Sequence, residues 1–220
     1  MKIISESKRR ILTALFIFLC VMLFCTFISQ TVYYHITPKV FCQSIRSGRL
    51  HKNYFLMLSE ASGEFFCEAD MYGENYFREG EKLSFDINGE KREFTINNIE
   101  NTGYNTRINL SAETLGEEEL ETVRRGAVWR SVSATTSAFD NIIPKTSLVN
   151  GMFVYAAANS TSIMGERQTV FAVKVEVICD SNQEYAIRFA SPSQAKEIRE
   201  IAASWDREIY DGDYVIVLRR

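Results

Sequence analysis

The apolar run ILTALFIFLCVMLFCTFISQTVYY, residues 11–34, decides how this chain is organised. It holds no charged residue, and a helix needs about 20 apolar residues to cross the roughly 30 Å hydrocarbon core of a bilayer. Tyr33 and Tyr34 end the run, where aromatic side chains are favoured at a membrane interface. The sequence therefore predicts a transmembrane helix over residues 11–34.

A cleaved signal peptide is the competing interpretation of the same run. Such a peptide has an apolar region of about 7–15 residues, followed by a cleavage site of small residues. The run here is longer, and residues 25–29 (CTFIS) offer no such site. We therefore interpret the helix as an uncleaved anchor.

Basic residues flank the run on both sides. Lys8, Arg9 and Arg10 close a ten-residue tail, and this tight cluster favours a cytoplasmic N-terminus, with the chain after residue 34 outside the cytoplasm. A looser basic segment follows the run and opposes that orientation: Lys39, Arg46, Arg49 and Lys52. The tight cluster leads us to expect a cytoplasmic tail over residues 1–10.

The chain after residue 34 is long enough for one ordinary domain or two small ones. It carries 21 Lys and Arg against 27 Asp and Glu, which gives no reason to expect nucleic acid as a partner. Three of the five cysteines lie here, at spacings that match no metal motif: Cys42, Cys67 and Cys179. We expect them to be small buried hydrophobic residues, with one disulfide plus a free thiol as the alternative.

Alternation of apolar and polar residues predicts many β-strands. The clearest case is a hairpin, in which residues 82–87 alternate, Asn88-Gly89 follows, and alternation resumes through Phe94 and Ile96. Asn-Gly favours a type I′ turn because both central residues need positive φ. Residues 128–133 predict a further strand, with Trp129 packed inside.

Two short helices are predicted among the strands. Residues 117–125 carry glutamates in the first turns and arginines in the last, with Gly126 as a stop, as the helix dipole favours. A second helix is predicted from about Ser193, because apolar residues recur at helical spacing: Ile198, Ile201, Ala202 and Trp205.

No pattern of catalytic or metal-binding residues is evident. The only histidines, His35 and His51, adjoin no recognisable nucleophile, and Asp211 and Asp213 are spaced for a turn. We therefore expect no enzyme activity, no cofactor and no metal site.

Several segments, taken in order, resemble HlyD-like membrane fusion proteins, the periplasmic adaptor subunits of efflux and secretion transporters. The anchor leads into YYHITPKV (residues 33–40), and FREGEKLSFDINGEKREFTINNIE (residues 77–100) resembles the opening of the family's β-barrel domain. IPKTSL (residues 143–148) is similar to the exit from that barrel. The strand at residues 170–177 and IYDGDYVIV (residues 209–217) resemble the membrane-proximal domain.

The resemblance implies a mainly β fold, in which the transmembrane helix precedes a small β-barrel domain and a membrane-proximal β domain with one or two short helices. It places an extended juxtamembrane segment at residues 35–63, the barrel at residues 64–143 and the membrane-proximal domain at residues 144–220. There is no room for the family's lipoyl domain and helical hairpin, so the chain resembles a shortened form.

The function implied is that of an anchored accessory subunit. Its expected partners are integral membrane transporter subunits, a permease and an ATPase, most simply of an ABC-type exporter; a homo-oligomer is also compatible. The alternative is a free-standing extracytoplasmic β module for sensing or envelope binding. Tyr72, Tyr76 and Phe77 are the candidate docking residues, unless they fill the end of the barrel.

Overall fold

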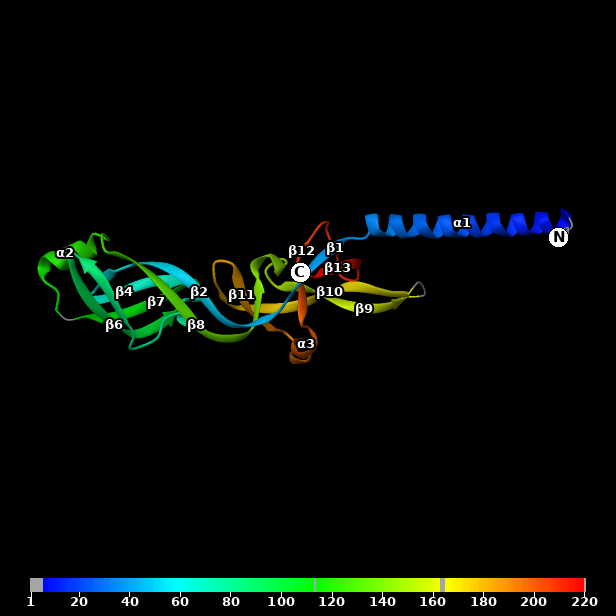
Figure 1. The fold of residues 1–220 in the computed structure, drawn as a ribbon. Coiled ribbons are helices and arrows are strands. Elements are labelled where there is room, and N and C mark those ends of the chain that lie inside the picture. Colours follow the sequence, from blue (N-terminus) through cyan, green and yellow to red (C-terminus); the bar gives the residue numbers. More distant parts are fainter. Residues whose placement is uncertain (1–5, 113, 163–164, 220) are drawn as a thin grey trace. The chain divides into compact units, whose positions relative to one another are not determined.

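The fold, a computed structural model of the chain, is mainly β with one long apolar helix at the N-terminus (Figure 1). The structure describes residues 6–112, 114–162 and 165–219. The predicted fold class is therefore confirmed. The chain forms two compact units, and each is assembled from separate parts of the sequence. Residues 144–220, predicted as one domain, supply parts of both units.

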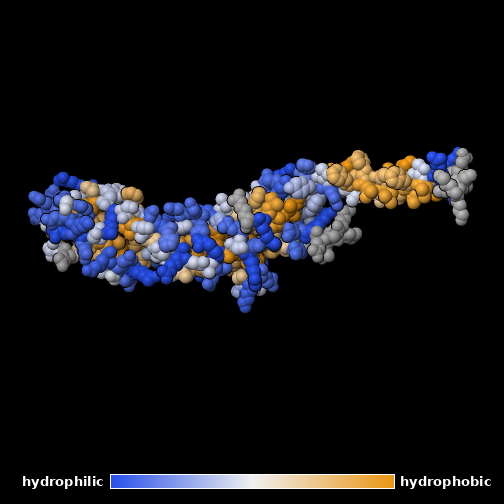
Figure 2. All heavy atoms as spheres, in the orientation of Figure 1, coloured by the Kyte–Doolittle hydropathy of each residue, from blue (hydrophilic) through white to orange (hydrophobic). Residues whose placement is uncertain are grey.

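Unit 1 comprises residues 1–43, 155–172 and 202–220. Its helix α1 (Glu6–Ile36) carries exposed apolar side chains along its length, and Figure 2 shows this hydrophobic surface. Within the described residues, α1 is the one helix long and apolar enough to span a membrane. The chain thus has the features of a single-pass membrane protein. Thr37 and Pro38 follow α1, and a proline there cannot continue a helix.

The rest of unit 1 is a small sheet built from both ends of the chain. Strand β1 (Lys39–Ser44) runs parallel to β13 (Tyr214–Arg219), and Lys39 lies opposite Ile216. The order β13-β1-β12-β9 continues through β12 (Glu200–Trp205) and β9 (Phe153–Ser162), and β13 also pairs with β10 (Gly165–Asp180). Its core contains Val40, Cys42, Val170, Ala202, Ile209 and Val215.

Unit 2 comprises residues 44–154 and 173–201 and contains the larger core. One sheet has the order β3-β4-β7-β6-β5. These strands are β3 (Ser59–Ala61), β4 (Glu64–Asp70), β5 (Lys82–Ile87), β6 (Glu90–Asn101) and β7 (Asn105–Ala112). The predicted hairpin is confirmed, since Leu83 lies opposite Phe94 and the two turn residues have φ of 55° at Asn88 and 87° at Gly89.

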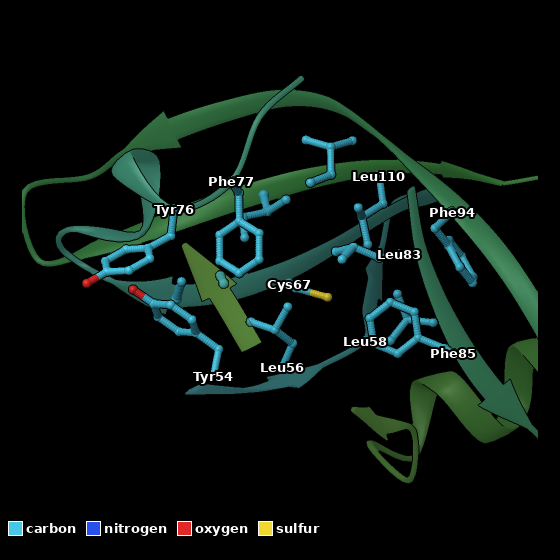
Figure 3. Packing of buried hydrophobic residues seen from close by; sticks show 14 of the residues in the cluster. Tyr54, Leu56, Leu58, Cys67, Tyr76, Phe77, Leu83, Phe85, Phe94 and Leu110 are labelled. Atoms are coloured by element: carbon cyan, nitrogen blue, oxygen red, sulfur yellow. The ribbon is translucent and has the colours of Figure 1, made fainter. Parts of the chain in front are cut away.

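The second sheet of unit 2 contains a long twisted ribbon. In it β2 (Arg46–Met57) pairs antiparallel with β8 (Trp129–Pro144), and β11 (Glu184–Phe189) extends the ribbon on the other side of β8. Aromatic and aliphatic residues from both sheets form one core, part of which Figure 3 shows. Short helices complete unit 2: η1 (Gly73–Asn75), α2 (Glu117–Arg124), η2 (Lys145–Ser147) and α3 (Pro192–Glu197).

The second predicted helix is mostly wrong. A helix does begin beside Ser193, but α3 ends at Glu197, and the supposed apolar stripe continues as strand β12. Ile201 and Ala202 are adjacent in sequence and both buried, at 0% and 1% exposure. A strand covered on both faces buries consecutive residues, and over a short stretch this pattern mimics helical spacing.

The cysteines follow the expectation of small buried residues. Cys42, Cys67 and Cys179 are all buried, with 7%, 0% and 0% of their surface exposed. Cys67 and Cys179 are free thiols. Burial raises the pKa of Cys67 to about 12 and that of Cys179 to about 11, so neither thiol ionises readily.

Candidate docking surface

Two of the predicted docking aromatics are buried in the core of unit 2. Tyr76 is 4% exposed and Phe77 is 2% exposed. Both rings pack on Tyr54, with centroid distances of 5.3 and 5.2 Å, and Figure 3 shows all three inside the fold. Tyr72 is partly buried against the same core. The prediction of a docking surface here is therefore wrong for Tyr76 and Phe77, which fill the core as the alternative interpretation held.

A cluster of four charged side chains lies beside these tyrosines. The Lys52 ammonium pairs with Asp70 and lies 2.5 Å from Oδ1 of Asp180, and the Lys145 Nζ lies 3.1 Å from Oδ2 of the same aspartate. Two cations therefore face two carboxylates. Burial lowers the pKa of Lys52, but hydrogen bonds and charges from Asp180 and Asp70 outweigh burial and raise it overall.

The tyrosines next to this cluster are held in their protonated form. Burial, and then the charge of Asp70, raise the pKa of Tyr54. Burial likewise raises the pKa of Tyr76, whose hydroxyl donates to the backbone carbonyl of Asp180 at 2.5 Å. General acid–base catalysis needs a group that can gain or lose a proton near neutral pH. The two cations and two carboxylates of this cluster neutralise one another, and we interpret the cluster as a structural link between β2, β4 and β10.

The histidines and the aspartates Asp211 and Asp213 have local structural roles. His51 Nδ1 lies 2.8 Å from Thr135 Oγ1 on the outside of the ribbon, and the His35 ring contacts the Tyr34 ring edge-on. Asp211 and Asp213 accept backbone N–H groups of Ala172 and Tyr210, each at 2.8 Å, as expected of turn residues. Among the residues that the structure describes, no three His, Cys, Asp or Glu side chains gather to hold a metal ion.

An apolar patch is exposed on the outer face of the β2–β8 ribbon. Phe55, Met57 and Trp129 form this Trp129 patch, with exposures of 74%, 36% and 55%. Met57 lies directly opposite Trp129 in the antiparallel register, and Phe55 lies opposite Ser131. Residues in such positions are close enough for their side chains to form one continuous surface.

The Trp129 ring is held in place by the end of helix α2. The indole Nε1–H donates to the carbonyl of Gly126 at 3.0 Å, so its polar group is satisfied within the fold. Gly126 follows the helix with φ of 69°, a conformation that favours glycine after a helix. A methyl group at Gly126 would lie 3.6 Å from the Met57 sulfur. The patch is thus a fixed part of the surface.

Along the ribbon, the residues next to the patch on the same face are polar and uncharged. Along the same face, Ser131 lies opposite Phe55, and Ser133 lies opposite Asn53. Protein interfaces have centres rich in Trp, Phe and Met and poor in charge, surrounded by polar groups. An exposed patch of this composition is typical of a docking site.

The sequence contained a signal for this patch that the prediction of a packed Trp129 overlooked. In an alternating strand Trp129 lies on the same face as Ser131 and Ser133, which is the polar face. Val128 and Ala134 lie on the other face and are buried. Period-two alternation therefore already placed the tryptophan outside. Phe55 had no such signal, because both phases of residues 54–58 (YFLML) are apolar.

Unit 2 also carries two grooves on its strands. One, of about 470 Å³, is polar, and among its lining residues are Lys82, Lys91, Arg92 and Glu93. The Lys82 ammonium lies 3.0 Å from Glu93, and Arg92 pairs with Glu119 at 2.7 Å, so carboxylates already offset two of the three cations. The other groove, of about 590 Å³, lies along β10 and β11 beside Tyr72, Lys174 and Phe189.

No protein-family model matches this chain, and no curated protein matches it either.

Proposed function

We propose that this chain is a membrane-anchored extracytoplasmic adaptor subunit that docks onto a membrane transporter, most simply an ABC-type exporter. The observation that carries the proposal is the Trp129 patch, an exposed apolar surface of Phe55, Met57 and Trp129 on a chain with one apolar helix long enough to span a membrane. A protein that acts by docking needs such a surface and needs no convergent titratable groups. The resemblance to HlyD-like adaptors supplies the class of partner.

The proposed adaptor is a shortened one that cannot bridge a distance as its longer counterparts do. After α1, the longest helix in the described residues is α2, which has eight residues. Two helices of that length give a hairpin only about 12 Å long, at 1.5 Å per residue. The chain would act at the transporter itself, as an accessory or regulatory subunit, with its N-terminus in the cytoplasm and residues 35–220 outside.

Co-purification of the full chain in mild detergent tests this proposal. The double variant Phe55→Ser/Trp129→Ser should lose its permease and ATPase partners by about tenfold or more, because aromatic hot spots cost 2 kcal/mol or more when truncated. Tyr104→Ser is the matched control, since Tyr104 is 89% exposed but lies outside the patch. Its partner recovery should equal that of the wild type.

Two results would count against docking through the patch. Recovery of the wild-type chain alone, with neither permease nor ATPase, would refute a transporter as its partner. Full partner recovery by the double variant would show that docking uses a surface other than the Trp129 patch. Thermal melting of each variant, followed by near-UV circular dichroism, shows that any loss of binding occurs in a folded chain. Phe55→Ser alone serves if the double variant melts early, because Phe55 is mostly exposed.

The second candidate function is a free-standing module that binds an envelope component. The polar groove beside Lys82, Lys91 and Arg92 favours it, because its volume of about 470 Å³ is within the range of small-molecule sites. Purification of the chain with a bound anionic envelope fragment and no transporter subunit would support this function over docking.

A further inference from the structure

Three cations from distant parts of the sequence meet at the end of helix α1, within unit 1. The Lys39 ammonium lies 4.2 Å from the centre of the Tyr34 ring, and the Arg167 guanidinium lies 4.9 Å from that of Tyr33. The Arg207 Nη1 donates to the carbonyl of Ile36 at 3.2 Å. We call Lys39, Arg167 and Arg207 the basic cluster.

The fold of unit 1 fixes this meeting point. Lys39 is the first residue of β1, and its backbone carbonyl accepts the N–H of Asp206 at 3.1 Å. This hydrogen bond places the neighbouring Arg207 beside the end of α1. Arg167 immediately precedes Gln168, which lies opposite Val215 in the β10–β13 pairing. The Arg167 guanidinium also lies 5.3 Å from the Tyr214 ring. The basic cluster is therefore assembled by β1, β10, β13 and the segment after β12.

The length of α1 sets the depth of the cluster in a membrane. The apolar residues 11–32 span about 33 Å at 1.5 Å per residue, which matches the hydrocarbon core. Tyr33 and Tyr34 then lie at the interface, and cations within about 5 Å of their rings lie in the headgroup layer, which is about 5–8 Å thick. The depth follows from contacts with α1 itself.

Three acidic residues of the adjoining segment accept backbone N–H groups, and Glu208 is hydrogen-bonded to the Tyr210 side chain. Asp206 accepts the N–H of Lys39 at 2.7 Å, while Asp211 and Asp213 accept N–H groups within unit 1. Within the described part of the chain, no carboxylate lies within ion-pair distance of Lys39 or Arg207. The charges of Lys39 and Arg207 at the headgroup layer can therefore attract an anion outside the protein.

We propose that the basic cluster binds the phosphate groups of anionic phospholipids in the leaflet where α1 leaves the membrane, and so holds unit 1 against the lipid surface. Charge complementarity carries this inference, because cations at that depth face lipid phosphates. It also revises the expectation of a basic juxtamembrane segment. Of that segment Lys39 stays in the cluster, whereas Arg46 and Lys52 belong to unit 2 and pair with carboxylates there. The proposal is independent of any transporter.

Lipid selectivity of the full chain tests it. The protein in neutral detergent is titrated with phosphatidylglycerol or phosphatidylcholine, and bound lipids are counted by native mass spectrometry. Lys8, Arg9 and Arg10 are replaced by Gln in every sample, because they would attract anionic lipid at the opposite end of α1. In this background we expect a preference for phosphatidylglycerol of tenfold or more, at about fivefold per cation.

The variant Lys39→Gln/Arg167→Gln/Arg207→Gln should bind both lipids equally. Arg78→Gln/Lys196→Gln/Arg199→Gln is the matched control, because it removes the same charge from exposed positions of unit 2 and should keep the preference. If the Lys39/Arg167/Arg207 variant unfolds, the salt dependence of lipid binding tests the proposal without that variant. Raising salt from about 0.05 to 0.5 M shortens the screening length and should abolish the preference.

Three outcomes would overturn the proposal: no preference in the starting background, an unchanged preference in the Lys39/Arg167/Arg207 variant, or an unchanged preference in high salt. Glycerol phosphate, the headgroup without acyl chains, identifies the source of the phosphate. If glycerol phosphate displaces the lipid at equal concentration, the site binds free phosphate groups, and the lipid surface is excluded as its specific ligand.

Discussion

The hydroxyl of Tyr76 donates a 2.5 Å hydrogen bond to the backbone carbonyl of Asp180, across 104 residues of chain. Tyr76 lies in the turn between β4 and β5, and Asp180 ends β10. Both belong to unit 2, so one buried phenol joins the turn to the long strand. This bond explains why a tyrosine that precedes the hairpin is part of the core.

Replacement of Tyr76 by Phe should destabilise unit 2 by about 1–3 kcal/mol, because the ring still fits but the buried carbonyl loses its donor. Urea unfolding of the full chain in detergent measures the change. Tyr104→Phe is the control, since this tyrosine is 89% exposed, and it should leave stability unchanged. Equal stability of the wild type and Tyr76→Phe would show that the bond contributes nothing.

Stability should fall as pH rises above about 10. The pKa of Lys52 is raised above its ordinary 10.5, because the nearby carboxylates outweigh burial, and burial raises that of Tyr54 above 10. The unfolded chain loses these protons near the ordinary values, while the folded chain retains them. Their contribution is therefore complete below pH 10 and is lost at higher pH. The raised thiol pKa values of Cys67 and Cys179 act in the same direction from about pH 9.

Urea unfolding between pH 8 and pH 11 measures this dependence. Tyr54→Phe removes one of the contributing groups, so its stability should decline less steeply above pH 10 than that of the wild type. Parallel curves for the two proteins would mean that Tyr54 ionises equally in both states, contrary to its burial.

Gly89→Val should destabilise unit 2 by about 1–3 kcal/mol, through backbone strain at positive φ. Nothing lies within 4 Å of a methyl group built at Gly89, so crowding does not contribute. Gly89→Asn is the control, because asparagine tolerates this conformation and should cost less. If Val and Asn are equally tolerated, the turn can adopt another conformation.

The proposed orientation, with the N-terminus in the cytoplasm, predicts which side of the membrane is labelled. A cysteine at position 104, in the variant Tyr104→Cys, should react with a membrane-impermeant maleimide on intact cells. The native Cys67 and Cys179 are fully buried and serve as an internal background. Labelling that appears only after permeabilisation would reverse the orientation and place residues 35–220 in the cytoplasm.

The elements that the sequence predicted well are those whose pattern is local. The run at residues 11–34 and the hairpin around Asn88-Gly89 each depend on contiguous residues, and α1 and β5–β6 follow them closely. The strand at residues 200–205 was not predicted because its hydrogen-bonding partners, β1 and β9, are distant in sequence. The position of Tyr76 likewise depends on a partner 104 residues away.

The same distinction applies to the candidate sites. The outward phase of Trp129 was readable from the serines that follow it, whereas the basic cluster was not. Arg167 and Arg207 lie more than a hundred residues after Lys39. The pairing of β10 and β1 with β13 brings Arg167 to the helix end, and the hydrogen bond between Asp206 and Lys39 brings Arg207 there. A sequence shows runs of charge, but it does not show which separate cations share a location.

The parallel pairing of β1 with β13 has a consequence for the order of events during synthesis. Strand β1 directly follows α1 and is the first strand of the sheet to be synthesised, yet its parallel partner β13 begins only at Tyr214. Most of unit 2 can form while the ribosome is still translating. Unit 1, although it contains the first strand made, can close only after β13 has been synthesised.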